Sequence, residues 1–171
     1  MADALRCEGK FADAIPFSKK ATELNPAEAT YWLELGDCYS PMRGRRNDAL
    51  KAYAQAVTAQ EEELKDDPKN GPGWMVLALA RVKAGSPQTA PGLIERADRV
   101  LAGDIDSQLR KARTLELLGK RDEALATVEA CLKRGATDFQ IQTMPDMGGL
   151  RSDPRYVKMV KSMPPATETT I

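Results

Sequence analysis

The stretch AEATYWLELGDCYSPMRGRRNDALKAYA, residues 29–56, decides the fold of this chain. Large and small apolar residues recur in it at intervals of three, four or seven, and they are Trp32, Leu35, Gly36, Tyr39, Ala49, Tyr53 and Ala56. Such a stripe is what a helix buries against its neighbours. We therefore expect two helices here, at about Ala27–Tyr39 and Asn47–Leu64, joined by the loop SPMRGRR.

The same spacing resembles the tetratricopeptide repeat, a helix–turn–helix unit of 34 residues with the signature Trp-x2-Leu-Gly-x2-Tyr. The resemblance implies an all-α fold, a right-handed α-solenoid of antiparallel helix pairs with a C-terminal capping helix. It also implies a function, which is to bind another polypeptide.

The resemblance divides the chain into one domain, residues 1–163, followed by a disordered tail at 164–171. Within the domain we expect a truncated repeat at about 1–28, repeats at 29–70, 71–104 and 105–136, and a tail with a capping helix at 137–163. Trp74 repeats the place of Trp32, and Gln108 replaces it in the last repeat. The repeat at 29–70 is longer than 34 residues, which predicts an extended second helix. The truncated first repeat suggests a piece of a longer protein.

Proline marks the expected irregularities. Pro16 lies inside an otherwise helical pattern, so that helix should start late, with Asp13 as its N-cap, or bend. Ser86 followed by Pro87 predicts an N-cap, and Pro91 predicts a distorted start. Asp153 followed by Pro154 predicts the start of the capping helix.

The composition excludes several functions. The chain has 25 basic and 25 acidic residues and no histidine, which argues against nucleic-acid binding, metal binding and general-base catalysis. Its three cysteines are far apart, so neither a disulfide framework nor a zinc site is expected. No apolar run is long enough to span a membrane, and no signal peptide is visible. We therefore expect a cytoplasmic protein that has no cofactor and no catalytic residues and that does not associate with a membrane.

Other residues have two interpretations. The four aromatic residues Trp32, Tyr39, Tyr53 and Trp74 could stack on nucleotides, but their spacing favours a core role. The basic loop around Arg45 could hold a phosphate, and the acidic run 61–67 could hold calcium, but solvated surfaces are the favoured interpretation of both. Cys131 stands where the family has alanine, which predicts a small buried residue.

By the resemblance, one set of positions in the first helix of each repeat faces a concave groove. The candidate binding residues are Thr30, Leu33, Glu34, Asp37, Met75, Val76, Leu79, Lys83, Asp106, Leu109, Arg110, Arg113 and Leu117. This lining is acidic early, apolar in the middle and basic late, which would suit a peptide of the opposite charge order. Alternatively, part of this face packs on the tail helix. The lysine–asparagine clamp for chaperone tails is absent, because Leu33, Asp37, Met75 and Leu79 occupy its places.

The leading hypothesis is a non-catalytic protein–protein interaction scaffold that binds a peptide or partner helix in this groove. One alternative is a regulatory or accessory region of a larger enzyme or signalling protein. Another is self-association through the uncovered first helix pair, which would give a homo-oligomer. An independent enzyme is the least favoured class, because no acid–base pair or phosphate-binding loop can be placed in the sequence.

Overall fold

The computed structural model describes residues 1–100 and 104–162, and no strand occurs within these ranges. The helices of the repeat region are α1 (Ala2–Cys7), α2 (Phe11–Leu24), α3 (Ala29–Tyr39), α4 (Arg46–Asp66), α5 (Gly71–Lys83), the 3₁₀ turn η1 (Pro87–Thr89), α6 (Ala90–Val100), α7 (Ile105–Leu117) and α8 (Arg121–Lys133). The tail contains α9 (Asp138–Gln142), the 3₁₀ turn η2 (Pro145–Met147), α10 (Gly148–Arg151) and α11 (Pro154–Lys161). The expected disordered segment 164–171 lies outside the described residues.

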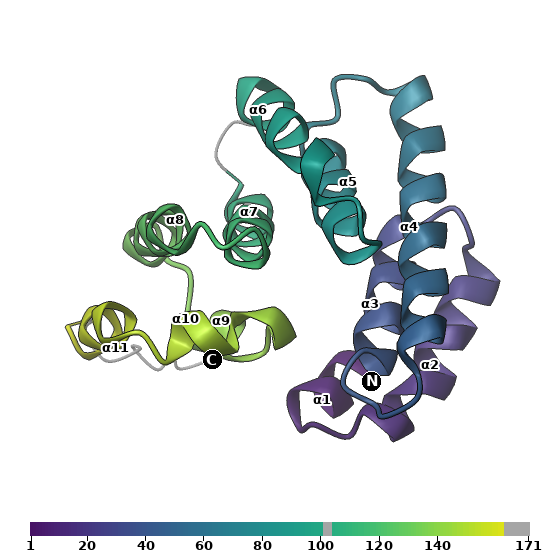
Figure 1. The fold of residues 1–171 in the computed structure, drawn as a ribbon, viewed down its shortest axis with the longest axis horizontal. Coiled ribbons are helices and arrows are strands. Elements are labelled where there is room, and N and C mark those ends of the chain that lie inside the picture. The colour runs from purple at the N-terminus through teal and green to yellow at the C-terminus, as the bar shows by residue number, and fades with distance from the viewer. Residues whose placement is uncertain (101–103, 163–171) are drawn as a thin grey trace, which may run out of the picture.

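The helices form antiparallel pairs that stand side by side in an arc (Figure 1). The first helices of the last three pairs, α3, α5 and α7, line the inside of the arc, and their partners α4, α6 and α8 lie outside it (Figure 1). We call the side chains that α3, α5 and α7 turn toward the inside of the arc the inner face. The all-α array of helix pairs expected from the sequence is confirmed.

One turn recurs between the helices of three pairs. In each, a glycine with positive φ ends the first helix, and the residue after it donates a backbone hydrogen bond five residues back. The glycines are Gly9, Gly85 and Gly119, with φ of 72°, 93° and 74°. Only glycine adopts this conformation without strain, so a glycine in the sequence of each of these three pairs specifies the turn. The loop between α3 and α4 is longer and has its positive-φ glycine at Gly44.

Two tryptophans confirm that the pairs are repeats of one unit. The indole Nε1 of Trp32 donates to the carbonyl of Pro26 over 2.9 Å, and that of Trp74 donates to the carbonyl of Pro68 over 2.9 Å. Each bond ties the start of a pair's first helix to the chain that enters it. The repeated sequence positions are therefore repeated contacts.

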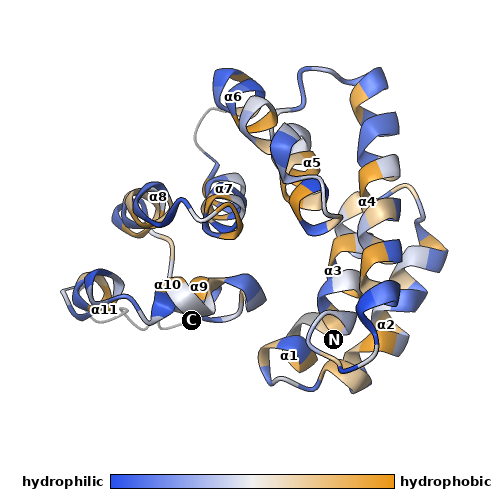
Figure 2. Cartoon of the chain, in the orientation of Figure 1, coloured by the Kyte–Doolittle hydropathy of each residue, from blue (hydrophilic) through white to orange (hydrophobic). Residues whose placement is uncertain are grey.

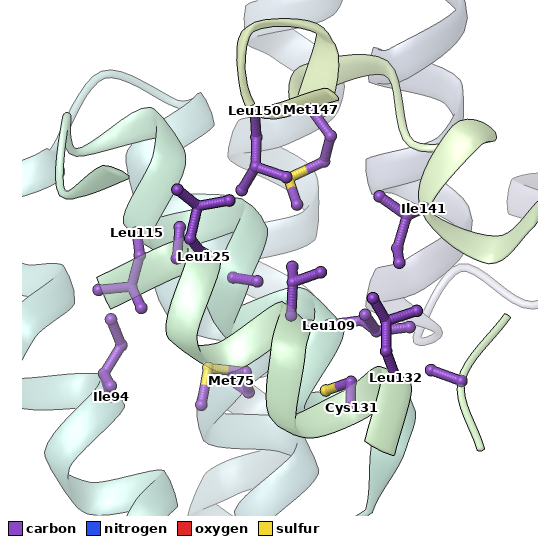
Figure 3. Close-up of a cluster of buried hydrophobic side chains, with 14 of the residues drawn as sticks. Met75, Ile94, Leu109, Leu115, Leu125, Cys131, Leu132, Ile141, Met147 and Leu150 are labelled. Atoms are coloured by element: carbon purple, nitrogen blue, oxygen red, sulfur yellow. The ribbon is translucent and has the colours of Figure 1, made fainter. Parts of the chain in front are cut away.

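Helix α5 is the centre of the core. Its side chains divide between two clusters, since Val76 and Leu79 pack with α3 and α4, while Met75 and Ala78 pack with α6, α7, α8 and the tail. The tail residues Met147 and Leu150 point into the second cluster (Figure 3), and both are fully buried. The tail therefore covers the end of the array, as the apolar face of a terminal repeat requires.

Helix α4 is 21 residues long, which confirms the extended helix expected from the long repeat. Its last turns are mainly hydrophilic (Figure 2). A small polar network holds this end: Gln60 and Asn70 both donate to the carboxylate of Glu63, and Asn70 accepts from the amide of Gly73. The extension is thus anchored to the start of α5.

The expectations for proline are only partly met. Helix α2 begins at Phe11 with Pro16 inside it, so the prediction of a late start capped by Asp13 is wrong. Pro16 is exposed, so water can satisfy the carbonyl that loses its partner. Ser86 makes no side-chain cap, but a 3₁₀ turn does precede α6, so the start is distorted as expected. Asp153 caps α11 by accepting from the amide of Arg155 over 2.9 Å.

We predict that Gly36→Ala destabilises the fold by about 1–3 kcal/mol through overpacking. A methyl group on Gly36 would lie 2.8 Å from Cζ of Tyr53 and closer still to two other ring carbons. Urea unfolding followed by circular dichroism measures the change. Gly92→Ala in α6 is the matched control, because nothing lies within 4 Å of its added carbon. It should be neutral or stabilising by up to about 1 kcal/mol, as alanine favours helix. Equal effects of the two substitutions would contradict the packing argument.

Candidate functional site

The structure buries the apolar part of the predicted groove. Five of the six apolar candidates are at most 5% exposed, namely Leu33, Met75, Val76, Leu79 and Leu109. They belong to the two core clusters and hold the helix pairs together. Their side chains are therefore closed to a partner in this arrangement. The binding role given to them from the sequence stays a prediction.

Three polar candidates meet on the inner face, together with one tail residue. Lys83 Nζ lies 2.7 Å from Oδ1 of Asp37 and 2.6 Å from Oδ2 of Asp146. Arg113 Nη2 lies 3.0 Å from Oδ2 of Asp37 and also donates to Oδ2 of Asp146. Each cation thus bridges the same two carboxylates. We call Asp37, Lys83, Arg113 and Asp146 the charge quartet.

The quartet draws its members from four elements. Asp37 comes from α3, Lys83 from α5, Arg113 from α7 and Asp146 from η2. The first three occupy successive first helices of the repeats, so the quartet runs along the inside of the arc. The formal charges of the four side chains cancel.

Asp37 is buried, with a side chain that is 4% exposed. The hydroxyl of Tyr53 in α4 donates to its Oδ1 over 3.0 Å, and Arg6 in α1 lies 3.9 Å from its Oδ2. The ring of Tyr53 lies beneath Lys83, with Nζ 5.0 Å from the ring centroid. Because Gly36 has no side chain, the ring can approach α3 closely enough to place its hydroxyl on Asp37.

These neighbours shift the acid–base behaviour of the site. Burial alone raises the pKa of Asp37, but the charges and hydrogen bonds of Lys83 and Arg113 outweigh it and lower that pKa to about 2. Burial lowers the pKa of Arg113, but the charges of Asp37 and Asp146 outweigh it and raise that pKa. Burial and the nearby carboxylates raise the pKa of the Tyr53 hydroxyl. Asp37 and Arg113 are therefore ionised, and Tyr53 is neutral, at neutral pH.

The remaining candidates are more accessible. Glu34 lies 3.9 Å from Arg6 and its side chain is 31% exposed. Thr30 and Arg110 are half-buried, Asp106 is exposed, and Leu117 is 39% exposed. Arg110 and Leu117 flank Arg113 at helical spacing, so they extend the inner face of α7 beyond the quartet.

The sequence predicted three quartet members and missed Asp146. The repeat pattern does not reach the tail, so no periodicity points to this residue. The predicted lining gave no signal of a missing carboxylate, because its positions hold three acids (Glu34, Asp37, Asp106) and three cations (Lys83, Arg110, Arg113).

A pocket of about 370 Å³ lies elsewhere, where the extension of α4 meets α5, η1 and α6. Leu64, Trp74, Leu77 and Leu93 line it, and Glu61 and Arg81 pair beside it. None of the quartet residues lines this pocket. The last turns of α4 form one wall of this pocket, through Glu61, Leu64 and Lys65.

The described residues contain no group of histidine, cysteine or acidic side chains that could hold a metal ion. Cys38 and Cys131 are buried, and burial raises the pKa of both thiols. Within the same part of the chain, no helix is long and apolar enough to cross a membrane.

The helix pairs, their shared glycine turn and the two Trp–proline hydrogen bonds define a tetratricopeptide-like helical-repeat protein. Among solved structures, the chain is similar to YrrB, a TPR protein described as having an unusual peptide-binding site. The match covers 94% of this chain and 79% of YrrB, at 22% sequence identity and a TM-score of 0.42. No protein-family model and no curated protein matches the sequence.

The low pKa of Asp37 predicts a pH-dependent contribution to stability. Its pKa is about 2 in the folded chain against an ordinary 3.8, so its ionised form stabilises the fold above about pH 4. That contribution, about 2 kcal/mol, should disappear as the pH falls from about 4 to about 2. Because asparagine resembles a protonated aspartate, the stability difference between wild type and Asp37→Asn should shrink by this amount over the same range.

Urea unfolding of both proteins at pH 6, 3 and 2 measures this difference. Asp122→Asn is the matched control, since that side chain is 87% exposed and its loss should change little at any pH. A difference between wild type and Asp37→Asn that stays constant from pH 6 to pH 2 would show that the quartet does not hold Asp37 ionised.

Proposed function

We propose that this chain is a non-catalytic protein-interaction module whose inner face binds a peptide or a partner helix. One observation carries the proposal: the inner face already holds a polypeptide segment from outside its three helices. The turn η2 places Asp146 against Lys83 and Arg113, and Met147 beside it is fully buried. A surface that recognises both a charge and an apolar side chain of a short segment has the chemistry that peptide binding needs.

The accessible part of this surface lies on α7 and α3. Arg110, Leu117, Thr30 and Glu34 offer a cation, an apolar side chain, a hydroxyl and a carboxylate around the closed quartet. Such a mixture suits a partner that combines polar and apolar groups. A cytoplasmic location and the division into one domain at 1–163 belong to the same proposal.

A display library of random twelve-residue peptides, selected on the full chain, tests the proposal. We expect the selected peptides to lose binding by at least about tenfold when Arg110→Glu is combined with Leu117→Glu. Arg110 is half-buried and Leu117 is 39% exposed, so the fold should tolerate both changes.

The matched control makes the same chemical changes outside the arc, with Leu50→Glu and Lys51→Glu in α4. Both residues are exposed. Circular dichroism checks the helix content of every variant. Peptides that bind the inner-face variant as tightly as wild type, or that lose binding only in the α4 control, would overturn the assignment of the inner face.

Self-association is a second candidate, favoured by the surface of α2. Phe17 and Leu24 lie seven residues apart on one face of this helix and are 46% and 74% exposed. Burying such a face against another copy would remove apolar surface from water. Sedimentation equilibrium at high protein concentration tests it, and a monomer there excludes it. The role of a regulatory region in a larger protein stays open as a third proposal.

A further inference from the structure

We propose that the inner face is a carboxylate-binding site, that Asp146 fills it in the free chain, and that an acidic partner replaces Asp146 there. The inference rests on the proposed function and names the chemistry of the partner. The carboxylate belongs to an acidic side chain of a peptide or to the C-terminus of a chain.

The first step is the division of the quartet into a receptor and an occupant. Asp37, Lys83 and Arg113 stand on the regular helices α3, α5 and α7. Asp146 stands on η2, a three-residue turn. Without Asp146, the other three side chains carry a net positive charge in a largely buried place. The receptor therefore requires an anion, and one carboxylate satisfies it.

The second step is that Asp146 does not use all of the site. It accepts from Nη2 of Arg113, while Nε of Arg113 is buried without a hydrogen-bond partner among the described residues. A carboxylate that approached the side edge of the guanidinium could accept from Nη2 and Nε together. Such a bidentate pair is the stronger form of this interaction. Asp146 thus leaves unsatisfied a donor that a carboxylate in another orientation would satisfy.

The third step concerns access. The side chains of Arg113 and Asp146 are 12% and 14% exposed, whereas those of Asp37 and Lys83 are 4% exposed. The quartet is thus least exposed at Asp37 and Lys83 and most exposed at Arg113 and Asp146. A partner can reach the site from the side on which the occupant sits.

The fourth step concerns the extent of the exchange. Met147 and Leu150 follow Asp146 and are fully buried in the core that caps the array. Their side chains can remain there while the backbone around Asp146 opens, because local openings involve far less of the structure than unfolding does. The exchange replaces one carboxylate by another and leaves the cap in place. In the free chain, Asp146 lowers the apparent affinity for the partner, because only the open fraction binds.

Three pentapeptides, the first two capped at both ends and the third capped only at its N-terminus, test the proposal on the full chain. The first has a central aspartate between alanines, the second has asparagine in its place, and the third has no acidic side chain but a free C-terminal carboxylate. Binding is followed by NMR, through the Nε–H signal of Arg113 and the amide signals of residues 143–149. We expect the aspartate peptide to shift the Arg113 signal and the asparagine peptide to leave it unchanged. The third peptide shows whether a chain terminus also serves.

The variant Asp146→Asn removes the occupant with almost no change in shape. Its affinity for the aspartate peptide should exceed that of wild type by about tenfold or more. Adding Lys83→Met to this variant should abolish the gain. Asp122→Asn is the matched control, because it makes the same change at a carboxylate that is 87% exposed and pairs with Arg155. Its affinity should equal that of wild type.

Equal affinities of wild type and Asp146→Asn, or no shift of the Arg113 signal with any peptide, overturn the proposal. If Asp146→Asn fails to fold, wild type decides. In it, the acidic peptide must shift the Arg113 signal and speed the hydrogen exchange of Met147, and the absence of either result overturns the inference. The proposed function fails separately. Selected peptides that lack an acidic group and bind the inner face independently of Asp146 would leave it standing while removing this inference.

Discussion

The structure depends on how one buried carboxylate is neutralised. Asp37 lies in the interior on α3, and an isolated charge there would cost several kcal/mol. Side chains from α4, α5 and α7 meet that cost together, through Tyr53, Lys83 and Arg113. Each of them must be delivered from a different helix to within about 3 Å. The charge on Asp37 therefore constrains the relative placement of three successive helix pairs, which apolar packing constrains only loosely.

This constraint links the repeat signature to the site. Gly36 is small so that the ring of Tyr53 can lie against α3. The ring position then sets the hydroxyl on Asp37 and supports Lys83 from below. Gly36 and Tyr53, which belong to the repeat signature in the sequence, thus also position the charges of the inner face. A substitution at Gly36 would therefore alter the charge quartet indirectly, by displacing the ring of Tyr53.

The sequence predicted most of the helices and part of the site, for different physical reasons. Helix ends depend on local rules, and the glycine turns and the Asp153 cap obey them. Pro16 is the exception, since packing of α2 overrides a local penalty that water relieves. Burial of Leu33, Val76 and Leu79 was not foreseen, because repeat positions give the direction of a side chain within its own pair. Which residues of the other pairs face that side chain depends on the curvature of the whole array.

The same reason explains the charges. The sequence placed an acid early and a base late along the inner face, and suggested a partner with the opposite order. The curvature instead brings Asp37 and Arg113 within 3.0 Å of each other, so the two ends neutralise one another within the chain. Lys83 then needs a further anion, and the tail supplies Asp146. A quartet that is already neutral gains little from a partner that only adds charge. In our proposal, specificity for a carboxylate comes from exchange at η2, because Asp146 is the one quartet member that is not on a repeat helix.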